Sequence, residues 1–274
     1  MRLSAVRALV LFASAALAET KSLKYKDTPL HQIIKENVQL RILPVGDSIT
    51  VGYLSSDGNG YRLKLQQNLF PNDLAFVGTE TSGDMNNGNY AAWSGRTIKY
   101  IADNVGPSLA QRPNIILLHA GTNDMNSKKE VSTEGNDPAG AAERLGSLID
   151  QMIAACPDAT ILVAQIIAAY EVHHWPAMKE YQKLIPEVVE QRRNASHHVI
   201  AVDFASIGQG VVQLLDDNIH PSDKGYQVMG DYWYDFITQI PKDWISQPVD
   251  VKAAGEGTGG GNTGGENPAN AEPL

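Results

Sequence analysis

The sequence contains a single cysteine, Cys156, among its 274 residues. No internal disulfide can form, so a hydrophobic core must stabilise the fold, and a chain of this length can build one. Beyond the first residues, no apolar run approaches the ~20 residues that a membrane-spanning helix needs. The H-E-x-x-H pattern of zinc proteases and the G-x-S-x-G pattern of α/β-hydrolases are also absent, which excludes both arrangements. We expect neither a metal nor a cofactor.

Positive charge is scarce as well. The chain has 22 Lys and Arg residues against 31 Asp and Glu residues, which gives a formal net charge of −9. An acidic surface repels nucleic acid and anionic membranes, so neither is expected as a partner. We expect a monomer.

The N-terminus has the composition of a secretion signal. Arg2 and Arg7 provide positive charge, Ala8 to Leu17 form an apolar run, and Ala16-Leu17-Ala18 has the small residues of a cleavage site. Residues 1–18 are therefore predicted to be a signal peptide, and the protein is predicted to be secreted and extracellular.

The rest of the chain divides by composition. Residues 19–39 form an N-terminal lead-in, residues 40–245 form the folded domain, and residues 246–274 form a glycine-rich tail that is predicted to be disordered. In a secreted chain, Asn194 in Asn194-Ala195-Ser196 is a predicted glycosylation site.

The folded part alternates apolar runs with helical patterns. The predicted strands are Leu40–Val45, Ala75–Thr79, Asn114–Ala120, Thr160–Ile167 and Val199–Phe204. The predicted helices are Tyr61–Leu69, Thr97–Gln111, Ala139–Ala155, Trp175–Arg193, in which Pro186 predicts a kink or a break, and Ser222–Thr238. Continuous runs of Val, Ile, Leu and Ala are typical of parallel strands buried on both faces. This order predicts an α/β fold: a flavodoxin-like three-layer α/β/α sandwich around a five-stranded parallel sheet.

Three polar strings follow predicted strands. Gly46-Asp47-Ser48 follows the first strand, Gly121-Thr122-Asn123-Asp124 follows the third, and Asp217-Asn218-Ile219-His220 follows the fifth. Ligands of open parallel sheets bind outside the carboxyl ends of the strands. We therefore expect the three strings to form one site.

The residue types in these strings suit nucleophilic catalysis. The Ser48 hydroxyl is a poor nucleophile at neutral pH and needs an imidazole to accept its proton, a role that His220 can fill. Asp217 can hold the imidazole in the correct tautomer. Asp216 competes for that role, and the spacing of three residues favours Asp217.

The negative charge that develops on a substrate carbonyl oxygen needs fixed hydrogen-bond donors. Asn123 offers a side-chain amide, and Gly95, in Trp93-Ser94-Gly95-Arg96, offers a backbone N–H that no Cβ obstructs. Ser48 offers its own backbone N–H. These three residues are the predicted oxyanion hole.

These blocks resemble the SGNH hydrolases, also called the GDSL esterase superfamily, from Leu40 to Thr238. The subgroup that they resemble most is carbohydrate esterase family 3, through the Gly-Asp-Ser-Ile-Thr block at Gly46, the His-x-Gly-Thr-Asn-Asp block that ends at Asp124, and the Asp-x-x-His-Pro block at Asp217. The resemblance implies the SGNH hydrolase fold and an acetylxylan esterase or similar deacetylase. Two departures are the replacement of the acidic and histidine residues before Ser-Gly by Tyr90-Ala91-Ala92-Trp93 and the absence of cysteines for an internal bridge.

Other polar and aromatic residues lie near the same edge. Asp47 and Asp124 are expected to brace their loops through backbone N–H groups. Trp93 and His173 are candidate substrate contacts, whereas His119, within an apolar strand, is expected to be a core histidine. Five aromatic residues near this edge are candidates for packing or for stacking on sugars: Tyr53, Tyr61, Tyr90, Trp93 and Trp175.

The predicted function is a secreted serine esterase that removes short acyl groups from an acylated polysaccharide or another small ester. Two alternatives stay open on the same scaffold. The first is a lipase or lysophospholipase that acts on longer acyl chains, and the second is a non-catalytic cell-wall carbohydrate-binding protein.

Overall fold

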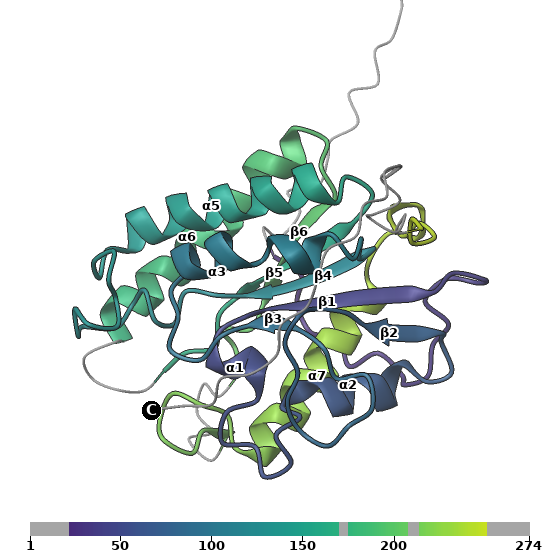
Figure 1. The fold of residues 1–274 in the computed structure, drawn as a ribbon, viewed down its shortest axis with the longest axis horizontal. Helices are drawn as coiled ribbons and strands as arrows, with labels where there is room; N and C mark the ends of the chain where they lie inside the picture. The colour runs from purple at the N-terminus through teal and green to yellow at the C-terminus, as the bar shows by residue number, and fades with distance from the viewer. Residues whose placement is uncertain (1–21, 170–174, 208–213, 251–274) are drawn as a thin grey trace, which may run out of the picture.

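The computed structural model describes residues 22–169, 175–207 and 214–250 (Figure 1). The predicted signal peptide, His173 and the part of the tail beyond residue 250 lie outside these residues. The strands are β1 (Leu40–Gly46), β2 (Leu74–Phe76), β3 (Ala91–Ala92), β4 (Ile115–His119), β5 (Thr160–Gln165) and β6 (Val199–Asp203). The helices are α1 (Ser48–Val51), α2 (Tyr61–Leu69), α3 (Ile98–Asn104), α4 (Gly106–Leu109), α5 (Pro138–Ala155), α6 (Trp175–Asn194), α7 (Asp223–Thr238) and the short 3₁₀ helix η2 (Lys242–Trp244).

The strands form one parallel sheet in the order β2-β1-β4-β5-β6, and β3 pairs with β1 as well. The first half of β1 pairs with β2, its last two residues pair with β3, and β4 runs along its other side. The prediction of a five-stranded sheet was therefore wrong by one strand. The two-residue strand β3 occupies the carboxyl end of the β1 edge that β2 leaves open.

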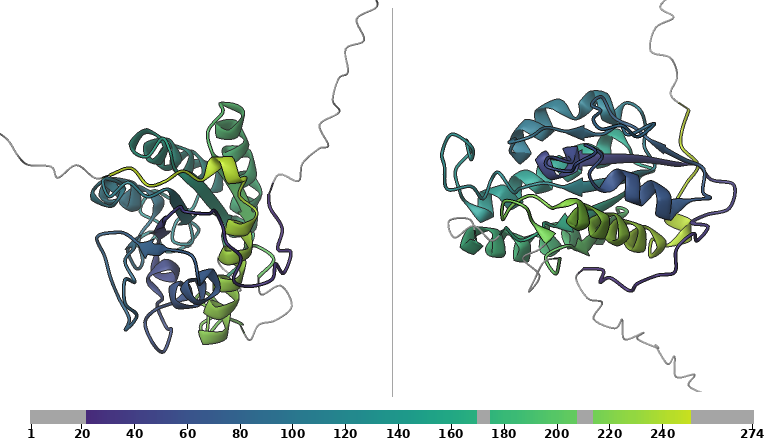
Figure 2. Two further views of the ribbon diagram at one scale, coloured as in Figure 1. Left: turned by 90° about the vertical axis from the view of Figure 1, so that its right-hand side faces the viewer. Right: turned by 90° about the horizontal axis from the view of Figure 1, so that it is seen from below.

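Helices cover both faces of the sheet (Figures 1 and 2). On one face, Leu43 and Val45 of β1 pack in a cluster with buried residues of α3, α4, α5 and α6. On the other face, Leu40 and Ile42 pack with buried residues of α1, α2 and α7. Successive side chains of a strand point to opposite faces, so a strand covered on both sides is apolar throughout. The predicted three-layer α/β/α fold is confirmed.

One predicted helix was wrong in its extent. The pattern from Thr97 to Gln111 forms two helices, α3 and α4, because Gly106-Pro107 starts a new helix with a proline in its first turn. The helix predicted from Trp175 to Arg193 is confirmed as α6, which runs through Pro186 without a break. Ile185, Val188 and Val189 around this proline are buried in the core, and their packing holds the helix together despite the lost N–H.

β2 begins and ends earlier than predicted. It covers Leu74–Phe76, and the chain leaves the sheet before Gly78, whose φ of +146° places it beside the backbone of Tyr90. A Cβ at Gly78 would lie 2.1 Å from the Tyr90 carbonyl oxygen, so only glycine fits there. None of the helices within the described ranges has the length and apolar character needed to cross a bilayer.

Candidate active site

Three strands end at the same level of the sheet. Gly46, the last residue of β1, is in register with Ala92 of β3 on one side and with His119 of β4 on the other. The segments that carry Ser48, Gly95 and Asn123 therefore leave the sheet side by side, two to four residues after this common level. The predicted convergence of the strings at Gly46 and Gly121 follows from this register, and the string from Asp217 to His220 is placed at the same edge by the hydrogen bond between His220 and Ser48.

Ser48 is placed by a tight junction between β1 and α1. Gly46 is indispensable here, because a Cβ on it would lie 2.3 Å from both the His119 carbonyl oxygen and Thr50 Oγ1. Asp47 is the N-cap of α1, and its Oδ1 accepts the Ile49 N–H at 3.0 Å. Ser48 is thus the first residue of a helix that is packed directly against the strand ends.

His220 and Asp217 share one hairpin-like turn. The Asp216 N–H donates to the His220 carbonyl at 2.9 Å, and Leu215 forms an antiparallel bridge with Pro221. Asn218 at the tip has a φ of +67°, a conformation that asparagine tolerates better than most residues.

The Asp217 carboxylate closes the turn and orients the ring. Its Oδ1 accepts the N–H groups of Ile219 at 3.0 Å and of His220 at 2.7 Å. Its Oδ2 lies 2.7 Å from His220 Nδ1, and His220 Nε2 lies 2.8 Å from Ser48 Oγ. With the proton on Nδ1, the hydroxyl donates to Nε2, which is the orientation that proton transfer from Ser48 requires. Asp217, and not Asp216, is the carboxylate that contacts the imidazole.

Two carboxylates in this region have shifted pKa values. Partial burial opposes ionisation of Asp217, but the hydrogen bonds from the backbone and ring of His220 and from the Ile219 N–H outweigh it and lower the pKa of Asp217. Asp217 is therefore ionised at neutral pH, as support of an imidazolium requires. Burial raises the pKa of Asp47 to about 6, against the lowering effect of its bond to Ile49.

Gly95 and Asn123 lie in two adjoining turns. Gly95 is exposed, has a φ of +72°, and would meet no atom within 4 Å if it carried a Cβ. Glycine is favoured at this position by its left-handed backbone conformation and not by lack of space. The open space in front of Gly95 leaves room for a ligand. Asn123 Nδ2 donates to the Arg96 carbonyl at 2.9 Å, which ties the two turns together. The second amide hydrogen of Asn123 is available to another acceptor.

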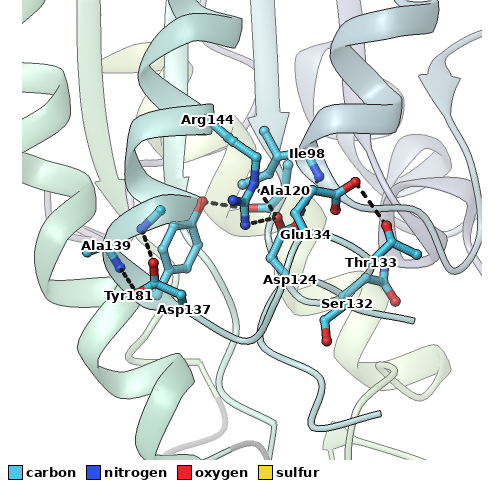
Figure 3. A network of polar contacts seen from close by, with 12 residues as sticks. Ile98, Ala120, Asp124, Ser132, Thr133, Glu134, Asp137, Ala139, Arg144 and Tyr181 are labelled. Atoms are coloured by element: carbon cyan, nitrogen blue, oxygen red, sulfur yellow. Dashed lines mark hydrogen bonds and ion pairs between the residues drawn. The ribbon is translucent and has the colours of Figure 1, made fainter. Parts of the chain in front are cut away.

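Asp124 braces its loop, as expected. Its Oδ2 accepts the Ile98 N–H at 2.9 Å, and its Oδ1 forms an ion pair with Arg144 of α5 (Figure 3). Arg144 was not singled out in the sequence, because its partner lies 20 residues away and no short spacing joins them.

The remaining predicted residues divide between core and surface. His119 is a core histidine: its Nε2 accepts the Ile167 N–H at 3.1 Å, and burial lowers its pKa to about 4. Tyr61 and Tyr90 are buried, so they pack rather than contact substrate. Trp93 is partly buried, packs against the core and meets Tyr100 edge to face. Asn194 is exposed at the end of α6.

Two further residues lie beside the nucleophile: Tyr53, one of the aromatic candidates near this edge, and Arg62, which the sequence did not indicate. Tyr53 is 50% exposed, its N–H donates to the Ser48 carbonyl, and its ring meets the His220 ring edge-on at 4.8 Å. Arg62 is fully buried and donates to the carbonyls of Thr50 and Val51, at 2.5 and 3.1 Å. The sequence Tyr61-Arg62 at the start of a predicted helix does not indicate that Arg62 is buried against these carbonyls.

The described part of the chain holds no group of three or more His, Cys, Asp or Glu side chains that could bind a metal ion. The side chains of the site provide a hydroxyl with a base at hydrogen-bond distance, an acid behind the base, and amide donors on adjacent turns.

Comparison with known proteins agrees with this geometry. The model of the GDSL-like Lipase/Acylhydrolase family matches residues 45–228, which is more than half of the chain. Among solved structures, a family 3 carbohydrate esterase from Clostridium thermocellum is 29% identical, has a TM-score of 0.63, and is similar over 73% of this chain and 98% of that one.

Two curated relatives are also similar. A multidomain esterase from Ruminococcus flavefaciens is 30% identical over 230 residues, which cover 72% of this chain and 28% of that protein. A protein from Acetivibrio thermocellus, provisionally named endoglucanase X, is 30% identical over 154 residues, which cover 55% of this chain and 62% of that one. The chain thus spans less than two thirds of the length of these relatives. By the match of the family model and the arrangement of Ser48, His220 and Asp217, the chain belongs to the GDSL-like Lipase/Acylhydrolase family and is a carboxylic ester hydrolase.

Proposed function

We propose that this protein is a secreted serine esterase that removes short acyl groups, chiefly acetyl, from plant cell-wall polysaccharide such as acetylated xylan. The observation that carries the proposal is the continuous chain of hydrogen bonds from Ser48 Oγ through His220 to Asp217 at the carboxyl edge of the sheet. The similarity to a family 3 carbohydrate esterase supports a carbohydrate ester as the substrate.

The proposed reaction has two halves. In the first, Ser48 Oγ attacks the ester carbonyl carbon while His220 Nε2 accepts the hydroxyl proton, and the carbonyl oxygen becomes an oxyanion. The N–H groups of Ser48 and Gly95 and the amide of Asn123 donate to this oxygen. When the tetrahedral intermediate collapses, the bond to the sugar oxygen breaks and His220 gives that oxygen its proton, leaving an acyl-serine.

In the second half, water replaces the sugar. His220 accepts a proton from the water, the hydroxide oxygen bonds to the acyl carbon, and the bond to Ser48 Oγ breaks as His220 returns a proton to the serine. The products are the free carboxylic acid and the restored enzyme. Asp217 stays ionised and stabilises the imidazolium in both halves.

Substitution of Ser48 tests the mechanism. Ser48→Ala should reduce the release of acetate from acetylated xylan to background while thermal unfolding stays close to that of the wild type. Ser147→Ala is the matched control, because Ser147 is an exposed serine on α5 that bonds only within its own helix. Both would be assayed by acetate release and with a chromogenic acetate ester. Full activity of the Ser48→Ala protein would contradict the acyl-serine mechanism.

A panel of substrates tests the substrate class. Acetylated xylan should lose acetate, a chromogenic acetate should be hydrolysed faster than the decanoate, and an unsubstituted glucan should yield no new reducing ends. A rate that rises from acetate to decanoate would favour a lipase. Binding to xylan without turnover of any ester would favour a carbohydrate-binding protein.

Secretion has its own test. The mature protein recovered from the culture medium should begin at Glu19, and a glycan at Asn194 should add mass that the Asn194→Gln variant lacks. A chain retained in cells with residue 1 intact would contradict the signal peptide.

A further inference from the structure

The carboxylate of Asp124 lies at the junction of the two segments that carry Gly95 and Asn123. It is 1% exposed and directly follows Asn123 in sequence. Its Oδ2 accepts the N–H of Ile98, the first residue of α3, three positions after Gly95. Thr97 is the N-cap of α3 but makes no capping hydrogen bond with its side chain, so Asp124 takes over that role from the neighbouring loop. One side chain thus holds both segments.

Arg144 fixes this carboxylate to the body of the protein. Its Nε and Nη2 donate to Asp124 Oδ1 at 3.2 and 2.9 Å, as Figure 3 shows. Arg144 projects from α5, an 18-residue helix of the core cluster beside it, whose first turn is capped by Asp137. Two donors from one guanidinium restrict the direction as well as the distance of the carboxylate.

The base of the Asn123 turn is fixed by a different helix. Tyr181 of α6 donates its hydroxyl to the Ala120 carbonyl at 3.0 Å. Its ring leaves no room for a Cβ at Gly121, which would lie 2.3 Å from Tyr181 Cε1. The turn is therefore anchored before Asn123 by Tyr181 and after it by Asp124, and only the Asp124 anchor is shared with the Gly95 segment.

The electrostatics make Asp124 dependent on Arg144. Burial raises the pKa of Asp124, the charge of Glu134 adds to this effect, and the donors Ile98 and Arg144 oppose it. Without the guanidinium, the carboxylate would stand in an apolar region beside a second acid. It would then take up a proton or turn toward solvent, and either change weakens its hold on the Ile98 N–H.

We propose that Arg144 and Asp124 are the positioning residues of the oxyanion hole, which hold the Gly95 N–H and the Asn123 amide at one fixed separation. The inference rests on the proposed function, since it assigns the pair a part in that reaction. Neither residue touches the substrate. Their effect is on the transition state, because that is where the alignment of the donors matters.

The test compares Arg144→Met with a matched variant, Arg192→Met. Arg192 of α6 also forms a two-donor pair, at 2.9 and 2.7 Å with Asp150 of α5, but Asp150 is exposed and lies outside both oxyanion segments. With a chromogenic acetate, Arg144→Met should lower kcat by about 10- to 100-fold with little change in KM, as expected for donors displaced by a fraction of an ångström. Arg192→Met should leave both constants close to those of the wild type. Arg144→Lys should recover part of kcat, and added guanidinium ion should raise the rate of Arg144→Ala but not that of Arg192→Ala.

A second measurement keeps the inference independent of turnover. In ¹H–¹⁵N spectra, Arg144→Met should shift the backbone signal of Gly95 and the side-chain signal of Asn123, and Arg192→Met should leave both in place. An unchanged kcat, or unmoved Gly95 and Asn123 signals in a folded Arg144→Met protein, overturns the inference while the esterase assignment stands. A wild-type protein that hydrolyses no ester overturns the proposed function, and the spectra then decide the positioning role alone.

Discussion

The two sides of the catalytic centre are each held by an arginine, fully buried in the case of Arg62 and partly buried in the case of Arg144, but the two arginines are satisfied in opposite ways. Arg62, on the nucleophile side, donates to the carbonyls of Thr50, Val51, Gly58 and Ser82 and to the Ser82 hydroxyl, and its guanidinium lies 4.4 Å from the centre of the Tyr90 ring. Arg144, on the oxyanion side, neutralises a buried carboxylate. The nucleophile is fixed through neutral backbone groups, and the oxyanion donors through an ion pair.

This difference separates the tasks of the two sides. Backbone carbonyls gathered around one guanidinium fix the path of the loops around α1, and with them the position of Ser48. An ion pair fixes one side chain, and that side chain transmits the constraint to two turns. Loss of Arg62 should therefore act first on folding, whereas loss of Arg144 should act first on the rate.

The largest expected effect is at the acid of the nucleophile side. Asp217→Asn keeps the size of the side chain but removes the charge that stabilises the imidazolium, and it should lower kcat by about 10³- to 10⁴-fold. Asp216→Asn is the matched control and should stay near wild-type activity, since only Asp217 contacts the ring. Steady-state kinetics on a chromogenic acetate measure both variants. Equal losses in the two would mean that the turn as a whole, rather than one carboxylate, supports the base.

The next effect distinguishes the two arginines. Arg62→Met leaves several buried carbonyls without donors and should lower the free energy of unfolding by about 3 kcal/mol or more. No second substitution can restore this lost stability, because the carbonyls that lose their donor belong to the backbone. By contrast, part of the stability lost in Arg144→Met should return when Asp124→Asn is added, because the unpaired charge is then gone. Urea unfolding of the four proteins measures this, and a double variant less stable than Arg144→Met would argue against a buried charged carboxylate.

The smallest effect concerns Asp47, the buried carboxylic acid next to Ser48. No ion pair of Asp47 is found among the described residues, and burial raises its pKa from 3.8 to about 6. Between these values the folded protein binds more protons than the unfolded chain, so the contribution of Asp47 to stability falls as pH rises from about 4 to about 6.

His119 masks this trend in the wild type. Burial lowers its pKa to about 4, so its contribution has the opposite sign and is lost as pH falls from about 6.5 to about 4. The stability of Asp47→Asn relative to the wild type should therefore increase from pH 4 to pH 7, which denaturant titrations at several pH values would measure. Parallel curves for the two proteins would show that the pKa of Asp47 does not differ between the folded and unfolded states.

The features that could be predicted from the sequence are those determined by neighbouring residues in the chain. The apolar runs identified five strands, and motifs following the ends of three of them placed Ser48, Asn123 and His220 at one edge, because strand direction and register in a parallel sheet leave little freedom. Ala91–Ala92 was missed as a strand because two residues carry no periodicity. Gly106-Pro107 did signal the break between α3 and α4, but the helical pattern on either side concealed it.

The two arginines that hold the site in place, Arg62 and Arg144, could not be predicted from the local sequence. Arg62 meets carbonyls of loops whose paths depend on the completed fold, and Arg144 meets a carboxylate 20 positions away. Neither pairing has a characteristic spacing in the sequence, so neither could be predicted from it. The chemistry of this enzyme is encoded in short motifs, and the precision of its geometry in distant contacts.

The turn that carries Asp217 and His220 is closed on itself. Its hydrogen bonds run between Asp216 and His220 and between Leu214 and Ser222, and its acid caps its own backbone. Acid and base therefore belong to one turn of nine residues, residues 214–222. The hydrogen bonds within this turn fix the position of Asp217 relative to His220. Substitutions in the loops that shape the substrate site can therefore leave the hydrogen bond between Asp217 and His220 unchanged, and only the contact with Ser48 depends on how the turn is docked.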